Sequence, residues 1–388
     1  MQRVLTWAVI LLVVAAGALG LAGWYYSDEV LRVPTASPVE RDVPLADVDP
    51  ERGMVTLAAD AGDLVELDLV GLATDTALLK LNGPARVDAD DGVARRRAVL
   101  LDGEWPEPGE LGGAVLDTFA GKPDAMLGIP LETVSIPGDR GQLPGWRVVP
   151  RKTATDDLWV VVVHSRGSTP TEGNRLQPTL AELRLPSLTV SVRNDPGAYA
   201  EPDGFSRFGH TEWRDVQAAV DHLREVEGAR RFVLAGFGQG ASSSLEFLRR
   251  SPDGDDVAAA VLVSPLVSLD AALELRAQTA GVPGPLATPL VHATRWVSQW
   301  RADLPRDAAE HLDHLDALPD ELPMLLTHGT ADRRVPVEAS RELSEQLGEQ
   351  VTYEEYEGVD HLREWNADRD RFEEDLQQFL EEHLPRER

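Results

Sequence analysis

The chain carries a catalytic motif whose reacting side chain is absent. Residues 236–240 read Gly-Phe-Gly-Gln-Gly, the spacing of a nucleophile elbow Gly-x-Ser-x-Gly, but with glycine at its centre. In that motif a sharp turn between a strand and a helix exposes a serine Oγ, and the outer glycines let strand and helix approach closely. Gly238 has no hydroxyl group, so it cannot attack a carbonyl carbon.

An acid and an imidazole follow the elbow along the chain. Asp332 lies in the turn after the apolar run 322–326, and His361 lies in the loop after the strand-like run 351–356. A carboxylate that orients an imidazole and stabilises its charged form is the arrangement that activates a serine hydroxyl. We therefore expect Asp332 and His361 to be the acid and the general base of a triad that lacks its nucleophile.

Neighbouring side chains offer poor substitutes for the absent serine. Ser242, Ser243 and Ser244 lie inside the helix expected over 241–250, where hydroxyl groups usually bond to backbone carbonyls or pack against a sheet. The chain contains no cysteine, which excludes a thiol nucleophile, a disulfide framework and a cysteine-based zinc site.

Together these residues resemble the α/β-hydrolase family, in particular its dienelactone-hydrolase and prolyl-oligopeptidase-like branches of serine esterases and peptidases. The resemblance covers about Leu131 to the C-terminus and rests on the elbow, the His328-Gly329-x-x-Asp332 turn and the pair Asp360-His361. It implies an α/β fold with a mostly parallel sheet flanked by helices. Gly238 is where the chain departs from the family pattern.

The resemblance also implies two oxyanion donors. One is the backbone N–H of Gln239, directly after the elbow centre. The other belongs to the loop His164-Ser165-Arg166-Gly167 after the buried run 158–163, and Ser165 stands there in a position commonly held by glycine. Its side chain either restricts the aim of the backbone donor or is small enough to be accepted.

Further candidates for the pocket come from the ends of expected strands and from a helical insertion. Ligands of open α/β sheets bind at the carboxyl ends of the strands, although the loop after 189–192 could equally be an Asn/Asp turn. A pair of tryptophans four residues apart could form an aromatic wall, although helix packing is the commoner use. The candidate pocket residues are His164, Arg166, Arg193, Asn194, Asp195, Trp296 and Trp300.

The chain divides into three predicted parts. Residues 1–27 form an apolar N-terminal helix, residues 28–125 a small β-rich unit with strand-like runs at 53–57 and 63–70, and residues 126–388 the hydrolase domain. A Pro- and Ala-rich helical insertion over 266–318 is expected to cap the pocket. The β-rich unit could cover the pocket, act as a spacer or complete the fold.

The apolar segment from Val4 to Tyr26 is long enough to span a bilayer, with Trp24, Tyr25 and Tyr26 at the interface. Arg3 before the span and Asp28 after it predict a single-pass cell-membrane protein with a cytoplasmic N-terminus and an extracytoplasmic hydrolase domain. The alternative is a signal peptide cleaved at 20–22, which would give a secreted protein.

Composition limits the partners. The chain has 66 acidic and 37 basic residues, a formal net charge of −29, which disfavours nucleic acid as a partner. No cofactor is expected. The pair His311 and His314 could suggest a metal-dependent hydrolase, but His-x-x-His without a catalytic glutamate is more often a solvated helix surface.

The sequence thus predicts a catalytically impaired hydrolase that binds a small-molecule ester, acyl or peptide-like ligand. Glycine at the elbow would relieve backbone strain on the order of 1–3 kcal/mol, which gives a physical reason for the replacement. The alternative is a weak ester or peptide hydrolase in which Asp332 and His361 activate a water molecule.

Overall fold

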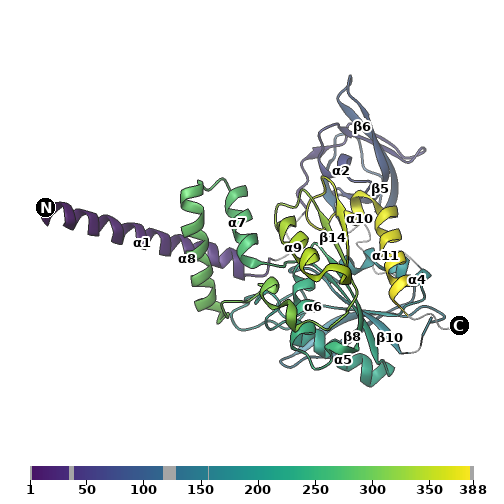
Figure 1. The fold of residues 1–388 in the computed structure, drawn as a ribbon. Helices are drawn as coiled ribbons and strands as arrows, with labels where there is room; N and C mark the ends of the chain where they lie inside the picture. The colour runs from purple at the N-terminus through teal and green to yellow at the C-terminus, as the bar shows by residue number, and fades with distance from the viewer. Residues whose placement is uncertain (1, 35–38, 117–127, 156, 385–388) are drawn as a thin grey trace.

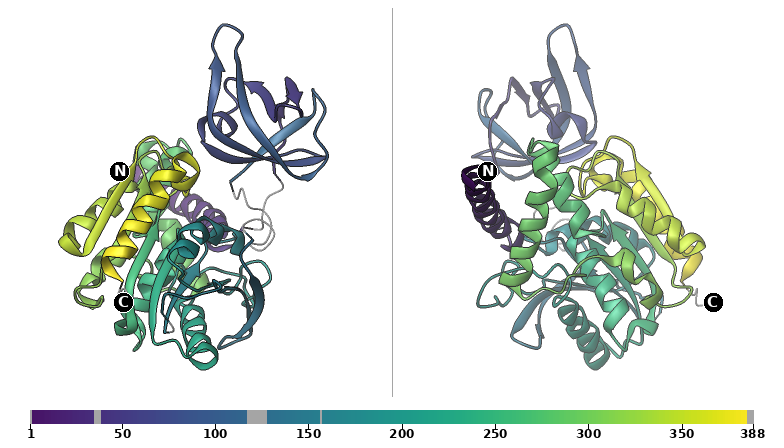
Figure 2. Two further views of the ribbon diagram at one scale, coloured as in Figure 1. Left: turned by 90° about the vertical axis from the view of Figure 1, so that its right-hand side faces the viewer. Right: turned by 60° about the vertical axis from the view of Figure 1, so that its left-hand side comes forward.

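The computed structural model describes residues 2–34, 39–116, 128–155 and 157–384. A larger α/β body carries a separate β-rich unit at the top of the view, and a long N-terminal helix projects to the left next to two helices of the insertion (Figure 1). Two further views show the β-rich unit standing above the body (Figure 2).

Among the described residues, the larger sheet has eight strands in the order β15-β14-β13-β12-β10-β11-β9-β8. The six strands from β15 to β11 run parallel, and β9 and β8 add antiparallel pairs at one edge. The mostly parallel sheet expected from the sequence is therefore confirmed. Their bounds are β8 Leu131–Pro137, β9 Gln142–Val148, β10 Leu158–Val163, β11 Ser187–Val190, β12 Arg231–Phe237, β13 Val257–Val263, β14 Met324–Gly329 and β15 Val351–Tyr356.

Helices cover both faces of this sheet, which is why its central strands are continuous apolar runs instead of alternating ones. Every residue of β10 and β14 is buried. Helices α5, α6 and α9 pack on one face, and α4, α10 and α11 pack on the other. Their bounds are α4 Gln177–Glu182, α5 Trp213–Glu227, α6 Gln239–Arg250, α9 Val337–Leu347, α10 Glu364–Ala367 and α11 Arg369–His383.

The insertion after β13 is helical, as expected for a cap. It contains α7 (Leu269–Thr279), α8 (Gly284–Ala302) and a 3₁₀ segment over His311–Ala317. Helix α1 (Gln2–Leu31) packs along α8 with its last turns, where the ring centroids of Trp24 and Trp300 are 6.0 Å apart.

The predicted transmembrane anchor over 1–27 is not supported. In the described part of the chain, no helix is both long and apolar enough to cross a membrane. Helix α1 continues past Asp28 to Leu31, and Arg301 of α8 bonds to Ser27 and Asp28 at 2.7 Å each. The C-terminal turns of α1 are thus held by polar contacts with protein.

The β-rich unit is a second sheet, whose seven strands within the described ranges follow the order β1-β7-β4-β5-β6-β3-β2, all antiparallel. The predicted boundary of this unit at 125–126 lies outside the described residues. The strands are β1 Val43–Pro44, β2 Asp47–Asp49, β3 Met54–Ala58, β4 Leu69–Ala73, β5 Ala77–Asp88, β6 Val93–Gly103 and β7 Leu111–Val115.

One expected strand in this unit is wrong. Residues 63–70 begin with a helical turn, α2 (Asp63–Glu66), before β4 starts at Leu69. The buried Arg96 side chain donates hydrogen bonds to the carbonyls of Leu64, Leu67 and Asp68, which satisfies acceptors that a strand would have paired. A residue distant in sequence therefore decided between turn and strand.

The β-rich unit is attached to the body through α10. The buried Asn366 amide donates to the carbonyl oxygens of Leu69 and Leu116, both at 2.8 Å. Arg363 also pairs with Asp63 of α2. Both anchoring residues lie within five positions of His361, so the unit is fixed to the segment that positions the imidazole.

Candidate active site

Gly238 occupies the turn between β12 and α6 at φ +52° and ψ −111°. Its N–H donates to Val263 O at 2.9 Å, and its carbonyl accepts from Leu266 N at 3.1 Å, so the neighbouring strand fixes the turn. Residues with a Cβ rarely adopt this conformation. The turn therefore has the backbone geometry of an elbow, which would strain a residue with a side chain but does not strain glycine.

The outer glycines of the motif serve close packing. A Cβ on Gly240 would collide with the carbonyl oxygens of Val163 and His164, and one on Gly236 would collide with the backbone of Ala241. Strand β10, strand β12 and helix α6 thus approach as closely as the motif requires.

The three serines of α6 are hydrogen-bonded inside the protein. Ser243 Oγ donates to Gln239 O at 3.2 Å, and Ser244 Oγ donates to Gly240 O at 3.0 Å. Ser242 Oγ donates to Phe208 O at 2.7 Å. All three are buried, and their hydroxyl groups are used by backbone carbonyls.

Asp332 and His361 meet beside Gly238. Asp332 Oδ2 lies 2.6 Å from His361 Nδ1, and His361 Nε2 lies 3.4 Å from the point that a Cβ on Gly238 would occupy. A carboxylate at Nδ1 holds the neutral imidazole in the tautomer whose Nε2 is free to accept a proton. The imidazole is therefore aimed at the place where a serine hydroxyl would be.

The carboxylate of Asp332 is held by several donors. Its Oδ1 accepts from the backbone N–H groups of Arg334 and Val335 at 2.7 and 2.8 Å, and its Oδ2 also contacts His328 Nε2 at 3.1 Å. Burial would raise the pKa of Asp332, but the hydrogen bonds with His328 and His361 hold that pKa well below its usual range. Asp332 is thus ionised and rigidly oriented.

The second expected oxyanion donor is engaged elsewhere. Ser165 N–H donates to Glu172 Oε2 at 2.5 Å, and Ser165 Oγ donates to Glu172 Oε1 at 2.9 Å. The prediction of Ser165 as an oxyanion donor is therefore wrong, because a buried carboxylate already holds its N–H. Gln239 opens α6, whose first N–H groups have no partner within the helix, and so keeps its predicted position.

A cavity of about 510 Å³ opens over Gly238 and His361. Its floor is the elbow, the His361 loop and the loop after β10; its sides come from α1, the Phe208 loop, the cap and the loop after Asp332. The lining residues are Glu29, Val30, Pro34, Ser165, Arg166, Phe208, Gly238, Gln239, Leu266, Leu269, Ala272, Leu273, Arg276, Arg333, Arg334, Val335, His361 and Leu362.

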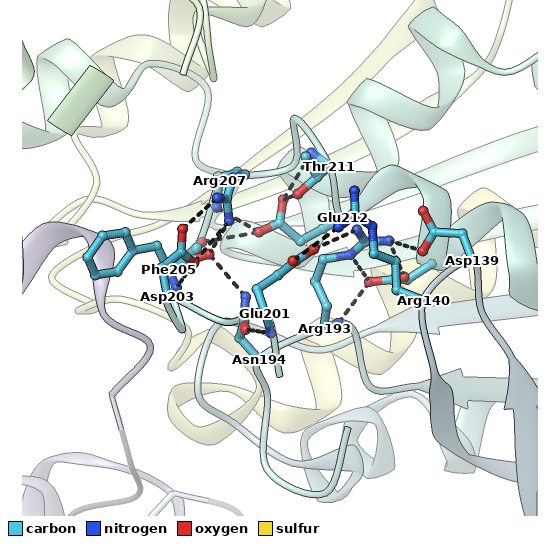
Figure 3. A network of polar contacts seen from close by, with 12 residues as sticks. Asp139, Arg140, Arg193, Asn194, Glu201, Asp203, Phe205, Arg207, Thr211 and Glu212 are labelled. Atoms are coloured by element: carbon cyan, nitrogen blue, oxygen red, sulfur yellow. Dashed lines mark hydrogen bonds and ion pairs between the residues drawn. The ribbon is translucent and has the colours of Figure 1, made fainter. Parts of the chain in front are cut away.

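Arg193 lies outside this cavity, in a polar network that supports the loop after β11 (Figure 3). Its guanidinium bonds to Asp215 at 2.7 Å, Asp139 at 2.8 Å and Glu201 at 3.3 Å. Burial would lower the pKa of Arg193, but the hydrogen bonds with Asp215 raise it above the usual range. Arg193 is a structural residue, contrary to its expected place in the pocket.

Asn194 and Asp195 lie in a turn, which was the second of the two interpretations of this loop from the sequence. Asn194 has φ +69°, and its side chain bridges Phe205 O and Glu201 N. Asp195 accepts from Gly167 N at 2.9 Å, and burial raises its pKa to about 6. Both residues lie behind the cavity wall and do not line it.

His164, Trp296 and Trp300 also lie away from the cavity. His164 is buried, with Nε2 2.9 Å from Ser191 Oγ. Trp296 and Trp300 are 67% and 69% exposed on the outer side of α8, so neither forms the expected aromatic wall. Of the seven predicted pocket residues, Arg166 lines the cavity and the other six are not among its described lining residues.

The two histidines of the insertion face different partners. His311 Nε2 lies 2.7 Å from Ser242 Oγ, and burial lowers the pKa of His311 to about 4. His314 Nε2 lies 2.8 Å from Asp307 Oδ2. Over the residues that the structure describes, no three metal-binding side chains come together.

Several lining residues escaped the sequence analysis. Phe208 has φ +54° and is held there by the buried Glu212 carboxylate, which accepts from Arg207 N at 2.7 Å and Gly209 N at 3.0 Å (Figure 3). In the cap, the four-residue spacing of Leu269 and Leu273 places both on one helix face, and this spacing could have indicated that they line the cavity.

No protein-family model matches the sequence, and a search of curated proteins finds no match either. Solved structures are similar in fold. Two crystal forms of the Pyrococcus furiosus esterase Pf2001 align with TM-scores of 0.52 and 0.53, at 18% and 19% identity. Each alignment covers 68% of this chain, and 96% and 95% of the esterase chains. With its parallel sheet, flanking helices, elbow and acid–histidine pair, the chain has the α/β-hydrolase fold.

Proposed function

We propose that this chain is a catalytically impaired protein of serine esterase or peptidase descent, which binds a small-molecule ester, acyl or peptide-like ligand without efficient cleavage. The observation that carries the proposal is Gly238 at the elbow, with His361 Nε2 directed at the position of the missing side chain. An acid and a base without a nucleophile cannot form an acyl-enzyme.

The electrostatics of the oxyanion region support the same proposal. The Ser165 N–H, the expected second oxyanion donor, is already bonded to the Glu172 carboxylate at 2.5 Å. Catalysis of acyl transfer depends on preorganised donors that are free to bond to the oxyanion, and a donor already bonded to a carboxylate is not free. The chain therefore lacks two separate contributions to catalysis.

A second candidate is slow hydrolysis by water. It is favoured by the intact contact between Asp332 and His361 and by the orientation of Nε2 toward the cavity. Enzymes deprived of a triad residue keep roughly 10³- to 10⁴-fold acceleration over water. Under this reading His361→Ala and Asp332→Ala should lower the rate of ester hydrolysis equally.

The deciding experiment is labelling with a fluorophosphonate probe together with hydrolysis of short p-nitrophenyl esters. We expect no labelling of the unaltered chain, and labelling of Gly238→Ser that is lost in Gly238→Ser/His361→Ala. Gly348→Ser is the matched control, because it adds a serine at a glycine of similar backbone conformation outside the cavity. Labelling of the unaltered chain that depends on His361 would contradict the proposal.

A further inference from the structure

The cavity over Gly238 is basic, although the chain has a formal net charge of −29. The described residues that line it include four arginines, at 166, 276, 333 and 334, and one acidic residue, Glu29. Arg276 pairs with Glu29 at 2.9 Å, and Arg333 pairs with Asp360 at 2.6 Å. Arg166 and Arg334 form no ion pair within 4.0 Å in the described parts of the chain, although Asp195 and Glu212 attract Arg166 from further away.

Arg166 lies at the inner wall of the cavity. It donates to the carbonyl of Val30 and lies over the Phe208 ring at 5.5 Å, and no carboxylate partner for it is found among the described residues. Burial and repulsion from Arg276 lower the pKa of Arg166 to about 10, although Asp195 and Glu212 attract its charge and act in the opposite direction. A negative charge placed between these side chains would relieve both penalties.

Gly238 presents no side chain to the cavity, so a bound group can approach the elbow backbone more closely than it could with serine there. The space next to Gly238 is bounded by Ser165 Cβ at 3.3 Å and His361 Nε2 at 3.4 Å from the would-be Cβ. The N-terminus of α6 opens into the same space, and free N–H groups at a helix start favour an anion. One side of this space is therefore suited to a small planar anion.

The cap contributes apolar side chains to the cavity, and a second cavity adjoins the first. Leu266, Leu269 and Leu273 face the first cavity from the cap. A second cavity of about 300 Å³ between α1, α7 and α8 shares Glu29, Val30, Leu273 and Arg276 with it. The remaining lining of the second cavity is mainly apolar or aromatic: Tyr25, Tyr26, Ala277, Ala280, Val282, Leu290, Val291 and Thr294.

Building on the proposed function, we infer that the ligand is a single-chain carboxylic acid, bound as the uncleaved product of an ester would be. Its carboxylate lies at Gly238 between the start of α6, His361 and the Arg166 side, and its hydrocarbon chain runs along the cap leucines into the second cavity. A carboxylate is the acidic group that cleavage of an ester leaves on the acyl half, which ties this ligand to the proposed descent from a serine esterase.

Titration calorimetry of the full chain with octanoate, dodecanoate and hexadecanoate tests the assignment, with dodecanol and dodecyl phosphate as head-group controls. We expect dodecanoate to bind at least tenfold more tightly than dodecanol. Affinity should rise by up to about fourfold for each methylene that enters the apolar channel. Equal affinity for acid and alcohol, or tighter binding of the phosphate, would overturn the inference.

Variants locate the head group and the chain. Arg334→Gln changes an exposed side chain and should weaken dodecanoate binding without changing that of dodecanol; Arg166→Gln should weaken it on the order of ten- to a hundredfold. Arg341→Gln is the matched control, since its guanidinium pairs with Glu355 outside both cavities. Leu273→Trp should remove the gain between octanoate and hexadecanoate by filling the junction.

The outcomes separate the inference from the proposed function. Dodecanoate binding that is unaffected by both Arg166→Gln and Arg334→Gln would refute the carboxylate site, whatever the probe labelling shows. Conversely, labelling of the unaltered chain through His361 would refute impaired catalysis, even if the acid binds as expected.

Discussion

Replacing Gly238 by serine should lower the free energy of unfolding by about 1–3 kcal/mol, because a side-chain-bearing residue would be forced into a sparsely populated backbone region. The backbone there has φ +52° and ψ −111°. Contacts add little, since the new Cβ would lie 3.3 Å from Ser165 Cβ and 3.4 Å from His361 Nε2, distances that need shifts of a few tenths of an ångström. Backbone strain is therefore the main cost.

Thermal unfolding measures this cost. For domains of 150–250 residues, 1 kcal/mol corresponds to roughly 2–4 °C, so Gly238→Ser should lower Tm by about 2–12 °C. Gly348→Ser should lower it similarly, because Gly348 has φ +58° and ψ −124° and no neighbouring atom within 4 Å of its would-be Cβ. The difference between the two variants gives the cost of crowding against Ser165 and His361.

The reasoning fails if Gly238→Ser unfolds at or above the temperature of the unaltered chain while Gly348→Ser unfolds below it. That result would mean that the hydroxyl gains more from His361 than the backbone loses. A gain of esterase activity in Gly238→Ser with the expected loss of Tm would instead place the substitution on a trade-off between stability and activity.

Three further predictions concern the support of the site. The pKa of Asp332 is lower in the folded than in the unfolded chain, so its ionised carboxylate stabilises the fold above about pH 4 and this contribution is lost on acidification. In Asp332→Asn the free energy of unfolding should therefore depend less on pH in the acid range, as measured by tryptophan fluorescence. Arg193→Met should cost about 3–5 kcal/mol in urea unfolding by stranding Asp215, and adding Asp215→Leu should recover most of it; no recovery would refute the pairing argument. Asn366→Ala should cost about 1–3 kcal/mol and speed hydrogen exchange in β4, whereas unchanged exchange would contradict its anchoring role.

The catalytic pattern was predictable because it depends on local sequence. The glycines of 236–240 are required by close backbone contacts around one strand–turn–helix unit. Asp332 lies three residues after β14, and His361 lies five residues after β15. Parallel strands deliver such residues to one edge of the sheet, so their meeting follows from the strand order. The fold and the acid–histidine pair were therefore accessible from residue types and spacing.

The surroundings of the site were not predictable, because they depend on pairings across the fold. Ser165 gave no sign that Glu172 would take its N–H, and Arg193 gave no sign that Asp215 of the next helix, α5, would neutralise it. The ion pair between Glu29 and Arg276 at the cavity joins residues that are far apart in the sequence. Trp296 and Trp300 have a spacing that fits a pocket wall as well as an outer helix face, and only the packing of α8 distinguishes the two.

The way in which α1 meets the cap sets how far the N-terminus can be shortened. Tyr25, Tyr26, Glu29 and Val30 of α1 line the two cavities, and Gly23 packs closely against Ala293 of α8. The Val30 carbonyl accepts a hydrogen bond from Arg166. Proteolysis that removes only residues before Gly23 would leave the walls of both cavities in place. Trimming beyond Leu31 would remove the wall that α1 contributes to the cavity and expose the cap leucines to water. It would also remove the Val30 carbonyl that accepts from Arg166. A shortened recombinant chain should therefore keep its residues from Gly23 onward.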